Sequence, residues 1–174
     1  MDEFILKSCS AEDLNVKITI LCVGKIKEKF YVQAIEEYMK RLKSYCKPEI
    51  IEVADEKTPD NASEKEEAII KDKEGERILA NIKDSAYVIA LAIEGVMPDS
   101  VELADKIDKL GISGVSHIIF MIGGSLGLSD RVLDRADFKL SFSRMTFPHQ
   151  LMRVILLEQV YRSYRIIKNE PYHK

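Results

Sequence analysis

Short apolar runs alternate with longer stretches of helical spacing from Val16 to the end of the chain. A short apolar run bounded by polar residues predicts a buried strand, whereas apolar residues three or four positions apart predict an amphipathic helix. Regular alternation of the two is typical of a parallel sheet with crossover helices. We therefore predict an α/β fold with strands at residues 17–23, 50–54, 87–93, 117–122 and 139–142.

Helices are predicted between these strands. Ser63 and Glu66 have the spacing of a capping box at the start of one helix, and Asp99 or Ser100 is suited to cap another that runs to Lys109. We expect the apolar stripes of the first two helices to face the core. The stripes are Phe30, Ala34, Ile35, Tyr38, Met39 and Leu42 in the first helix, and Ile69, Ile78, Leu79 and Ile82 in the second.

The last predicted helix, residues 148–169, is apolar over a wider arc than packing on one face requires. Pro148 is suited to its first position, with Thr146 or Phe147 near the cap. Arg153 projects onto the apolar side, where a cation near a helix start needs an acceptor such as a carboxylate or phosphate. The wide arc predicts a partner subunit; it contains Leu151, Met152, Val154, Ile155, Leu156, Leu157, Val160, Tyr161, Tyr164 and Ile167.

The chain of 174 residues is close to the length of one typical domain. We predict a single domain over residues 16–174, because no stretch within them has the composition of a linker. Residues 1–15 show no strand period and precede a run that resembles a natural protein start, so we interpret them as a leader or a mis-assigned start.

The cysteines and the apolar runs indicate the cellular compartment in which the protein is expected. Cys9, Cys22 and Cys46 are odd in number and widely spaced, which favours a reducing environment over a disulfide framework. No apolar run reaches the roughly 20 residues that span a bilayer, and the acidic start differs from a signal peptide. We therefore expect a cytoplasmic protein.

The formal net charge of −3 conceals a segregation of charge along the chain. Residues 49–76 carry eleven acidic side chains against four lysines, whereas residues 138–174 carry seven basic side chains against two acidic ones. Because Lys and Arg dominate binding to phosphate, we expect nucleic acid to approach the second region. Solvated helix faces would explain both blocks without any function.

The candidate ligand site begins at a glycine-rich loop. Gly123, Gly124 and Gly127 follow an apolar strand, and ligands bind at the carboxyl ends of strands in open α/β sheets. A plain strand-to-helix turn is the alternative, because the loop has neither dinucleotide nor P-loop spacing. The segment that follows offers hydroxyls and apolar walls for a small molecule: Ser141, Ser143 and Thr146 with Phe142, Met145 and Phe147.

Taken together, five motifs resemble the SPOUT-class methyltransferases that modify N3 of a pseudouridine in large-subunit ribosomal RNA. They are residues 17–21, 120–127, 140–150, 158–162 and 172–174, and the resemblance covers the chain from Val16 onward. It implies a SPOUT-type parallel sheet with a C-terminal deep trefoil knot, an exception among folds. It also implies a homodimer through the knot region, S-adenosylmethionine as the cofactor, no metal, and ribosomal RNA as the substrate, with no role for a membrane.

The resemblance also assigns residues to the site. The implied cofactor contacts are Leu91, Gly123, Phe142, Ser143, Arg144, Met145, Thr146 and Phe147. Methyl transfer to an imide nitrogen needs alignment, exclusion of water and removal of a proton. The candidates for these catalytic tasks are His173, Tyr172, Arg153 and His149, with Lys174 and Arg144 as RNA contacts.

We expect the tail of one subunit to close over the cofactor of the other. Two alternatives stay open at this point. One is a ribose 2'-O methyltransferase of the same class, and the other is a non-catalytic RNA-binding or ribosome-assembly module. The first would yield a different methylated nucleoside, and the second would bind RNA without consuming the cofactor.

Overall fold

The computed structural model describes residues 16–174, so the prediction for residues 1–15 lies outside the described part. Its sheet has five strands in the order β2-β1-β4-β3-β5, and all of the pairs are parallel. The strands are β1 (Lys17–Val23), β2 (Lys47–Val53), β3 (Tyr87–Val96), β4 (His117–Ile122) and β5 (Phe138–Leu140). The helices are α1 (Lys29–Leu42), α2 (Glu64–Leu79), α3 (Ser100–Ile112), α4 (Asp130–Arg135) and α5 (His149–Ile167). The predicted α/β class is confirmed.

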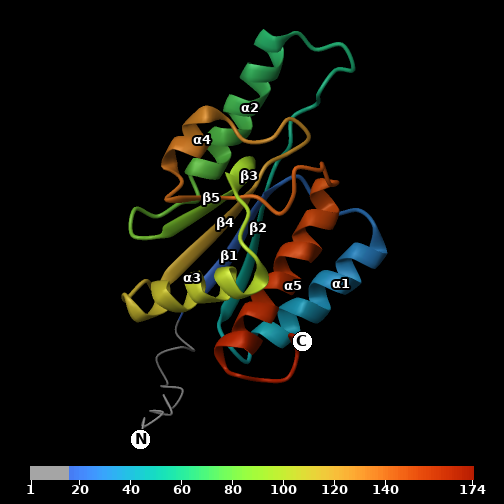
Figure 1. Cartoon of the computed structure of the whole chain (residues 1–174). Helices are drawn as coiled ribbons and strands as arrows, with labels where there is room; N and C mark the ends of the chain where they lie inside the picture. Colours follow the sequence, from blue (N-terminus) through green and yellow to red (C-terminus); the bar gives the residue numbers. More distant parts are fainter. Residues whose placement is uncertain (1–15) are drawn as a thin grey trace, which may run out of the picture.

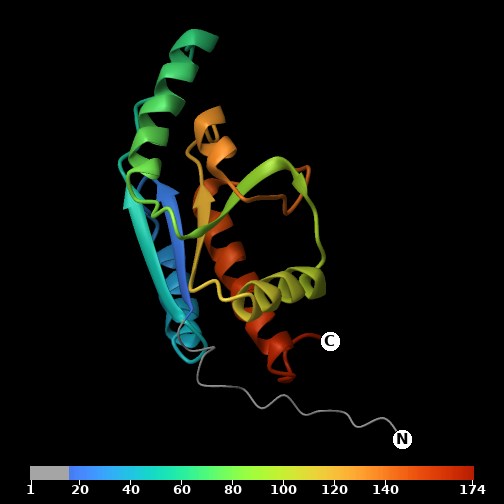
Figure 2. The ribbon, with the colours of Figure 1, turned by 90° about the vertical axis from the view of Figure 1, so that its left-hand side faces the viewer.

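Helices cover both faces of the sheet (Figures 1 and 2). Helices α1, α3 and α5 pack on one face, around a core that includes Phe120 and Leu157. Helices α2 and α4 pack on the other face, around Met121 and Val132. Burial on both sides explains why β1 and β4 read as continuous apolar runs rather than as alternating patterns.

Several predicted boundaries were wrong. Strand β2 begins three residues before the predicted start, and β3 continues to Val96, because Val96 pairs with Leu140 after an irregularity that begins at Leu91. Strand β5 ends at Leu140, and the next amide, of Ser141, donates to the Val96 carbonyl (2.8 Å). Pro148 is the N-cap of α5 rather than its first residue, since its ψ of 132° is extended.

The predicted capping box at Ser63 is confirmed, and Asp99, one of the two predicted cap candidates, caps α3 and also forms a capping box. Two apolar positions expected in the core are instead exposed: Phe30 at 60% and Ile69 at 47%. Phe30 lies in the first turn of α1. Ile69 lies in the N-terminal half of α2, and this helix projects beyond the sheet (Figure 1).

The end of β3 passes close to β5. A side chain on Gly95 would place its Cβ 2.7 Å from the backbone of Lys139, so only glycine permits this approach. The trefoil knot implied by the resemblance stays a prediction. Within residues 16–174, no helix is both long and apolar enough to cross a membrane.

Candidate active site

A pocket of about 690 Å³ opens beside the middle of β3 and at the ends of β4 and β5. Residues 91–93, 122–127, 140–143 and 145–149 line it, together with Met152 from the first turn of α5. These segments are far apart in the sequence, and the parallel sheet brings their carboxyl ends to one edge. Both the position and the size are typical of a small-molecule site in an α/β protein.

The glycine-rich loop forms one wall of this pocket. Gly124 and Gly127 pair as an isolated antiparallel bridge, and Gly127 has a φ of 82°, which favours glycine. Gly123 is enclosed, because its Cβ would lie 2.5 Å from the backbone carbon of Gly127. The tight turn therefore brings backbone close to the pocket, beside Ser125 and Leu126, which also line it.

Replacing Gly123 with alanine is expected to weaken ligand binding at this pocket. The added Cβ meets backbone atoms of Gly127, which cannot rotate away, so the turn must open. We expect the affinity for S-adenosylmethionine to fall by at least about tenfold, in calorimetric titration, because the cradle depends on close backbone approach. Gly111→Ala is the control, since a Cβ there meets no atom within 4 Å. Unchanged affinity in Gly123→Ala would show that the turn is not part of the binding site.

The opposite wall is the loop after β5, which hydrogen bonds to itself. The Ser141 hydroxyl donates to the Ser143 carbonyl (3.1 Å), and the Met145 amide donates to the Ser143 hydroxyl (2.9 Å). Of the residues predicted to contact the cofactor, Arg144 alone does not line the pocket; its neighbours on both sides do. Those that line it are Leu91, Gly123, Phe142, Ser143, Met145, Thr146 and Phe147.

Arg153 lies behind the pocket and is fully buried. Its guanidinium donates to the Glu52 carboxylate (2.6 Å) and to the carbonyls of Val23 (2.9 Å) and Gly24 (2.7 Å). The prediction that this arginine needs an acceptor is thereby confirmed, and the acceptor is a carboxylate. With these contacts, Arg153 ties the first turns of α5 to the end of β1, and it does not line the pocket.

His149 lines the pocket at the start of α5. Burial lowers the pKa of the imidazole, and the nearby Arg153 cation lowers it further, while Asp55 acts in the opposite direction. A lowered pKa keeps the ring neutral at neutral pH, so that it can accept a proton. Among the predicted catalytic candidates, His149 is the one that faces the pocket of its own chain.

The C-terminal tail does not line this pocket. The Tyr172 hydroxyl donates to Glu158 (3.1 Å), Arg162 lies over the Tyr172 ring (4.7 Å), and His173 lies 3.4 Å from Arg162. Glu158 is about 14 Å of helix beyond the first residue of α5. Within one chain, Tyr172 and His173 are thus docked on α5 away from the pocket, and Lys174 is exposed.

Sequence reasoning missed several lining positions, among them Ile93, Leu140 and Met152. Ile93 and Leu140 were predicted as strand residues, and nothing in the sequence marked them as lining a pocket. Met152 looked like an ordinary member of an apolar helix face. No group of three or more His, Cys, Asp or Glu side chains within residues 16–174 is arranged to hold a metal ion.

A parallel sheet with a glycine turn and a hydroxyl-rich loop around one pocket defines an α/β enzyme of the kind that binds a small cofactor. Residues 16–173 match the model of a family described as a predicted SPOUT methyltransferase. The match spans most of the chain, and the protein belongs to this family. The family recognised from the motifs is confirmed.

Curated relatives with a more specific name match closely. The "Ribosomal RNA large subunit methyltransferase H" proteins of Clostridium novyi (strain NT) and Bacillus pumilus (strain SAFR-032) are each 64% identical over 159 residues, which cover 91% of this chain and the whole of each relative. Among solved structures, a methylase family protein from Haemophilus influenzae Rd KW20 has 14% identity and a TM-score of 0.48, covering 92% of this chain and 70% of its own. A Legionella pneumophila methyltransferase solved with bound SAM has 11% identity and a TM-score of 0.45, covering 86% and 66%.

Proposed function

We propose that the protein is an S-adenosylmethionine-dependent methyltransferase that modifies N3 of a pseudouridine in large-subunit ribosomal RNA. Membership of the SPOUT methyltransferase family and 64% identity to the named ribosomal RNA methyltransferases support this proposal. The observation that carries it is the pocket beside β3 and at the ends of β4 and β5, which is lined by all of the implied cofactor contacts except Arg144.

The residues of the pocket fit this cofactor. The turn at Gly123 presents backbone at close range, and Leu91 and Phe142 supply apolar walls of the kind that enclose an adenine ring. When bound, S-adenosylmethionine supplies a methyl group on a sulfonium, which is already an activated electrophile. The tasks left to the protein are to orient the acceptor nitrogen, to exclude water and to receive the imide proton.

We assign the proton transfer to His149. Its imidazole faces the pocket, and its lowered pKa leaves the neutral, accepting form dominant at neutral pH. Tyr172 is unsuited to this task, because burial, with contributions from Tyr38 and Glu158, raises its pKa to about 12. A phenol that stays protonated can donate a hydrogen bond and so orient the target nucleobase, which is the role we give to Tyr172.

The pH dependence of catalysis tests this assignment. A base must be unprotonated, so kcat/KM should fall as pH drops through the pKa of His149, and this acid limb should lie below the ordinary histidine value of about 6.5. His149→Gln should lower kcat by roughly 10²-fold and remove the limb. The measurement is kcat/KM over roughly pH 5 to 8.5 for both proteins. An acid limb that persists unchanged in His149→Gln would assign the base elsewhere.

The placement of the tail supports a homodimer with shared sites. Tyr172 and His173 are docked on α5 of their own chain, away from its pocket, so they can act at a pocket only if a second subunit presents one. Part of the wide apolar arc of α5 also stays incompletely buried, as at Leu151 and Ile155. We propose that the tail of each subunit closes the pocket of the other.

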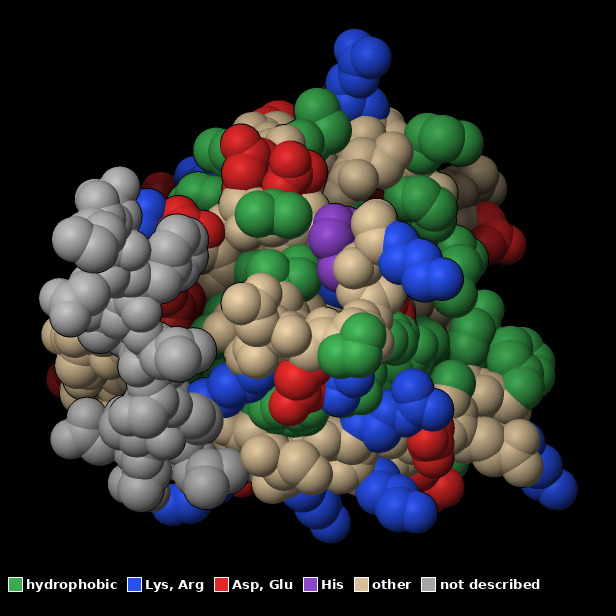
Figure 3. All heavy atoms as spheres, turned by 60° about the horizontal axis from the view of Figure 1, so that its bottom comes forward, with side chains coloured by type: hydrophobic (Ala, Val, Ile, Leu, Met, Phe, Trp, Pro, Cys, Tyr) green, Lys and Arg blue, Asp and Glu red, His purple; other side chains and the backbone are tan. Residues whose placement is uncertain are grey.

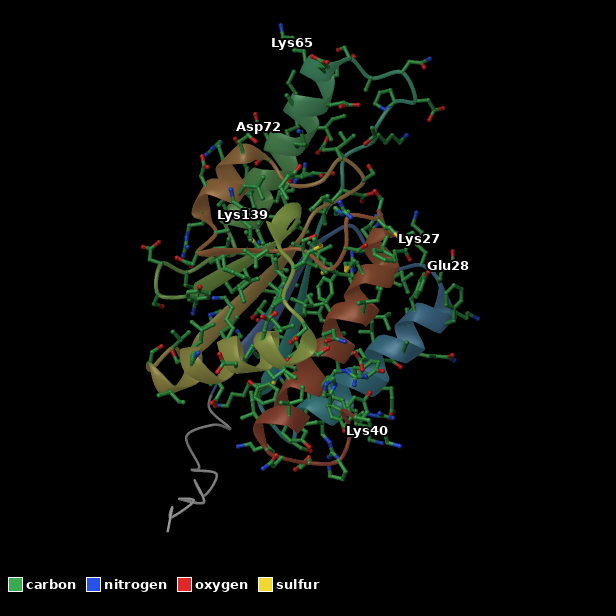
Figure 4. The ribbon with its side chains drawn as sticks, in the orientation of Figure 1. Lys27, Glu28, Lys40, Lys65, Asp72 and Lys139 are labelled. Carbon is green, nitrogen blue, oxygen red and sulfur yellow. The ribbon has the colours of Figure 1, made fainter. Side chains whose placement is uncertain are left out.

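The RNA is proposed to contact exposed basic groups near the closed site. Arg144 is exposed between two pocket-lining residues, and Lys174 is exposed at the end of the tail. Lysine and arginine side chains are also prominent on the face of the molecule that holds the C-terminus (Figure 3), and Lys40 lies at the end of α1 nearest to it (Figure 4). A confined basic face in an acidic protein suits a structured target such as the assembled ribosome. Such a substrate implies that the protein acts in the cytoplasm.

Identification of the methylated nucleoside tests the proposed function. The protein is incubated with methyl-labelled S-adenosylmethionine and either assembled ribosomes or deproteinised ribosomal RNA, and the RNA is then digested. We expect label in N3-methylpseudouridine, with transfer into assembled ribosomes. Label in a 2'-O-methylated ribose would favour the ribose methyltransferase instead. Cofactor binding without transfer into either RNA would favour the non-catalytic module.

A further inference from the structure

A buried carboxyl group lies directly under the glycine-rich loop. Glu74 of α2 is 4% exposed, and one of its carboxylate oxygens has no hydrogen-bond partner within the described residues. A Cβ on Gly124 would lie 3.0 Å from that oxygen. Since Gly124 lines the pocket and carries no side chain, little more than its backbone separates this oxygen from the pocket.

Two other contacts fix the Glu74 carboxylate in this place. Its second oxygen accepts the backbone N–H of Glu56 (2.9 Å). The neighbouring Gly75 allows α2 to approach, because a Cβ there would lie 2.5 Å from the Ser129 hydroxyl. Helix α2 is thus packed against the start of α4, which follows the glycine-rich loop. This packing holds the Glu74 carboxylate against that loop.

The charge of Glu74 is not neutralised by an ion pair in residues 16–174. Arg77, the nearest arginine on α2, instead pairs with Glu56 and donates to the Ala54 carbonyl (2.8 Å). Burial raises the pKa of Glu74, and the negative charges of Asp55 and Glu56 add to this, against the Glu56 N–H and Arg77. An unpaired acid in such a place is stabilised in its ionised form when a cation binds nearby.

We infer that the carboxylate of Glu74 makes the pocket select a positively charged sulfonium over the neutral thioether. This inference rests on the proposed function, because it concerns the cofactor of that reaction. In methyl transfer the S–CH3 bond breaks and an N–CH3 bond forms, sulfur keeps the electron pair and loses its charge, and the N3 proton passes to the base. The Glu74 carboxylate thus attracts the sulfonium of S-adenosylmethionine but not the neutral sulfur of S-adenosylhomocysteine. The loss of this attraction after transfer favours release of the product.

The test compares ligands that differ in charge at one position. Calorimetry measures the Kd of S-adenosylmethionine, of sinefungin, which carries an amine where the methyl sulfonium stands, and of S-adenosylhomocysteine. In Glu74→Gln we expect the two cationic ligands to bind roughly tenfold more weakly, while S-adenosylhomocysteine changes by less than about twofold. Glutamine keeps the shape of the side chain and can still accept the N–H of Glu56. The control is Glu76→Gln, which removes the same charge from an exposed side chain of α2.

Each outcome is decisive. Equal weakening of all three ligands would make Glu74 a structural support of the loop and overturn its role in selecting charge. Unchanged affinities in Glu74→Gln would show that the negative charge of Glu74 does not contribute to ligand binding. Failure of the unaltered protein to bind any of the three would refute the proposed function instead, which separates the two proposals.

A second measurement applies if Glu74→Gln does not fold. The ratio of the affinities for S-adenosylmethionine and S-adenosylhomocysteine is followed over roughly pH 5 to 8 with Glu74 intact. His149→Gln is used as the background, because His149 also faces the pocket and titrates. The preference for the cation should rise with pH as Glu74 ionises; the other charged groups around it are Asp55, Glu56 and Arg77. A ratio independent of pH would overturn the inference.

Discussion

A chain that ends at Pro171 is expected to bind S-adenosylmethionine with unchanged affinity and to lose methyl transfer by roughly three orders of magnitude. Tyr172, His173 and Lys174 do not line the pocket of their own chain, so their removal leaves the cofactor site intact. The truncation removes the groups that we propose to orient the target nucleobase and to close the pocket of the second subunit. Calorimetry gives the affinity, and transfer of labelled methyl to ribosomes gives the rate.

Mixed dimers separate this prediction from a general loss of stability. A truncated chain retains a pocket, and a Gly123→Ala chain retains a tail. If sites are shared, a dimer of the two restores one complete site, although each variant alone is inactive. Removal of Lys174 alone is the matched control and should weaken RNA binding more than turnover. Full activity in the chain that ends at Pro171 would refute the role of the tail.

Replacement of Arg153 with methionine is expected to lower the free energy of unfolding by about 3–5 kcal/mol, the range for breaking a buried ion pair from one side. The guanidinium is fully buried and satisfies the Glu52 carboxylate and the carbonyls of Val23 and Gly24. Methionine fills a similar volume, so most of the loss comes from acceptors left without a donor. Urea denaturation at a fixed protein concentration measures the change, since the proposed dimerisation would make stability concentration-dependent.

A surface pair provides the control for this measurement. Lys109 pairs with Asp105 on α3, with both side chains largely exposed, and Lys109→Met should leave the unfolding midpoint within error. In Arg153→Met, a second change of Glu52 to glutamine should recover part of the stability, because it removes the unpaired charge. A loss below about 1 kcal/mol in Arg153→Met would show that water replaces the lost donors and that the pair contributes little.

Local patterns predicted the fold well where one segment determined its own structure. The apolar runs of β1 and β4 identify strands to the residue, because both faces of each are buried. The extension of β3 to Val96 depends instead on pairing with Leu140, 44 positions later in the sequence. The partner of Arg153 could be predicted as an acceptor such as a carboxylate or phosphate, but not as Glu52, which is brought near by the sheet. Contacts between distant segments are what a single sequence conceals.

The same limit applies to the site. The glycines and hydroxyls that line the pocket were recognisable, because these residue types have few other reasons to cluster after apolar strands. Glu74 gave no such signal, since it lies among many acidic residues in a helix that reads as solvated. Only its burial beneath Gly124 distinguishes it from Glu76 two positions later. The sequence alone does not distinguish a functional carboxylate from a solvated one; the packing of the helix does.

The projecting, acid-rich helix α2 and the end of the molecule that holds the C-terminus lie far apart (Figure 1). Negative charge at one extreme and positive charge near the other give the protein an electric dipole moment along its length. In the field of a phosphate-covered particle, such a dipole experiences a torque that turns α2 outward before any contact is made. A larger fraction of encounters then occurs in the productive orientation, which should raise the association rate constant. This increase should decline as salt shortens the range of the field.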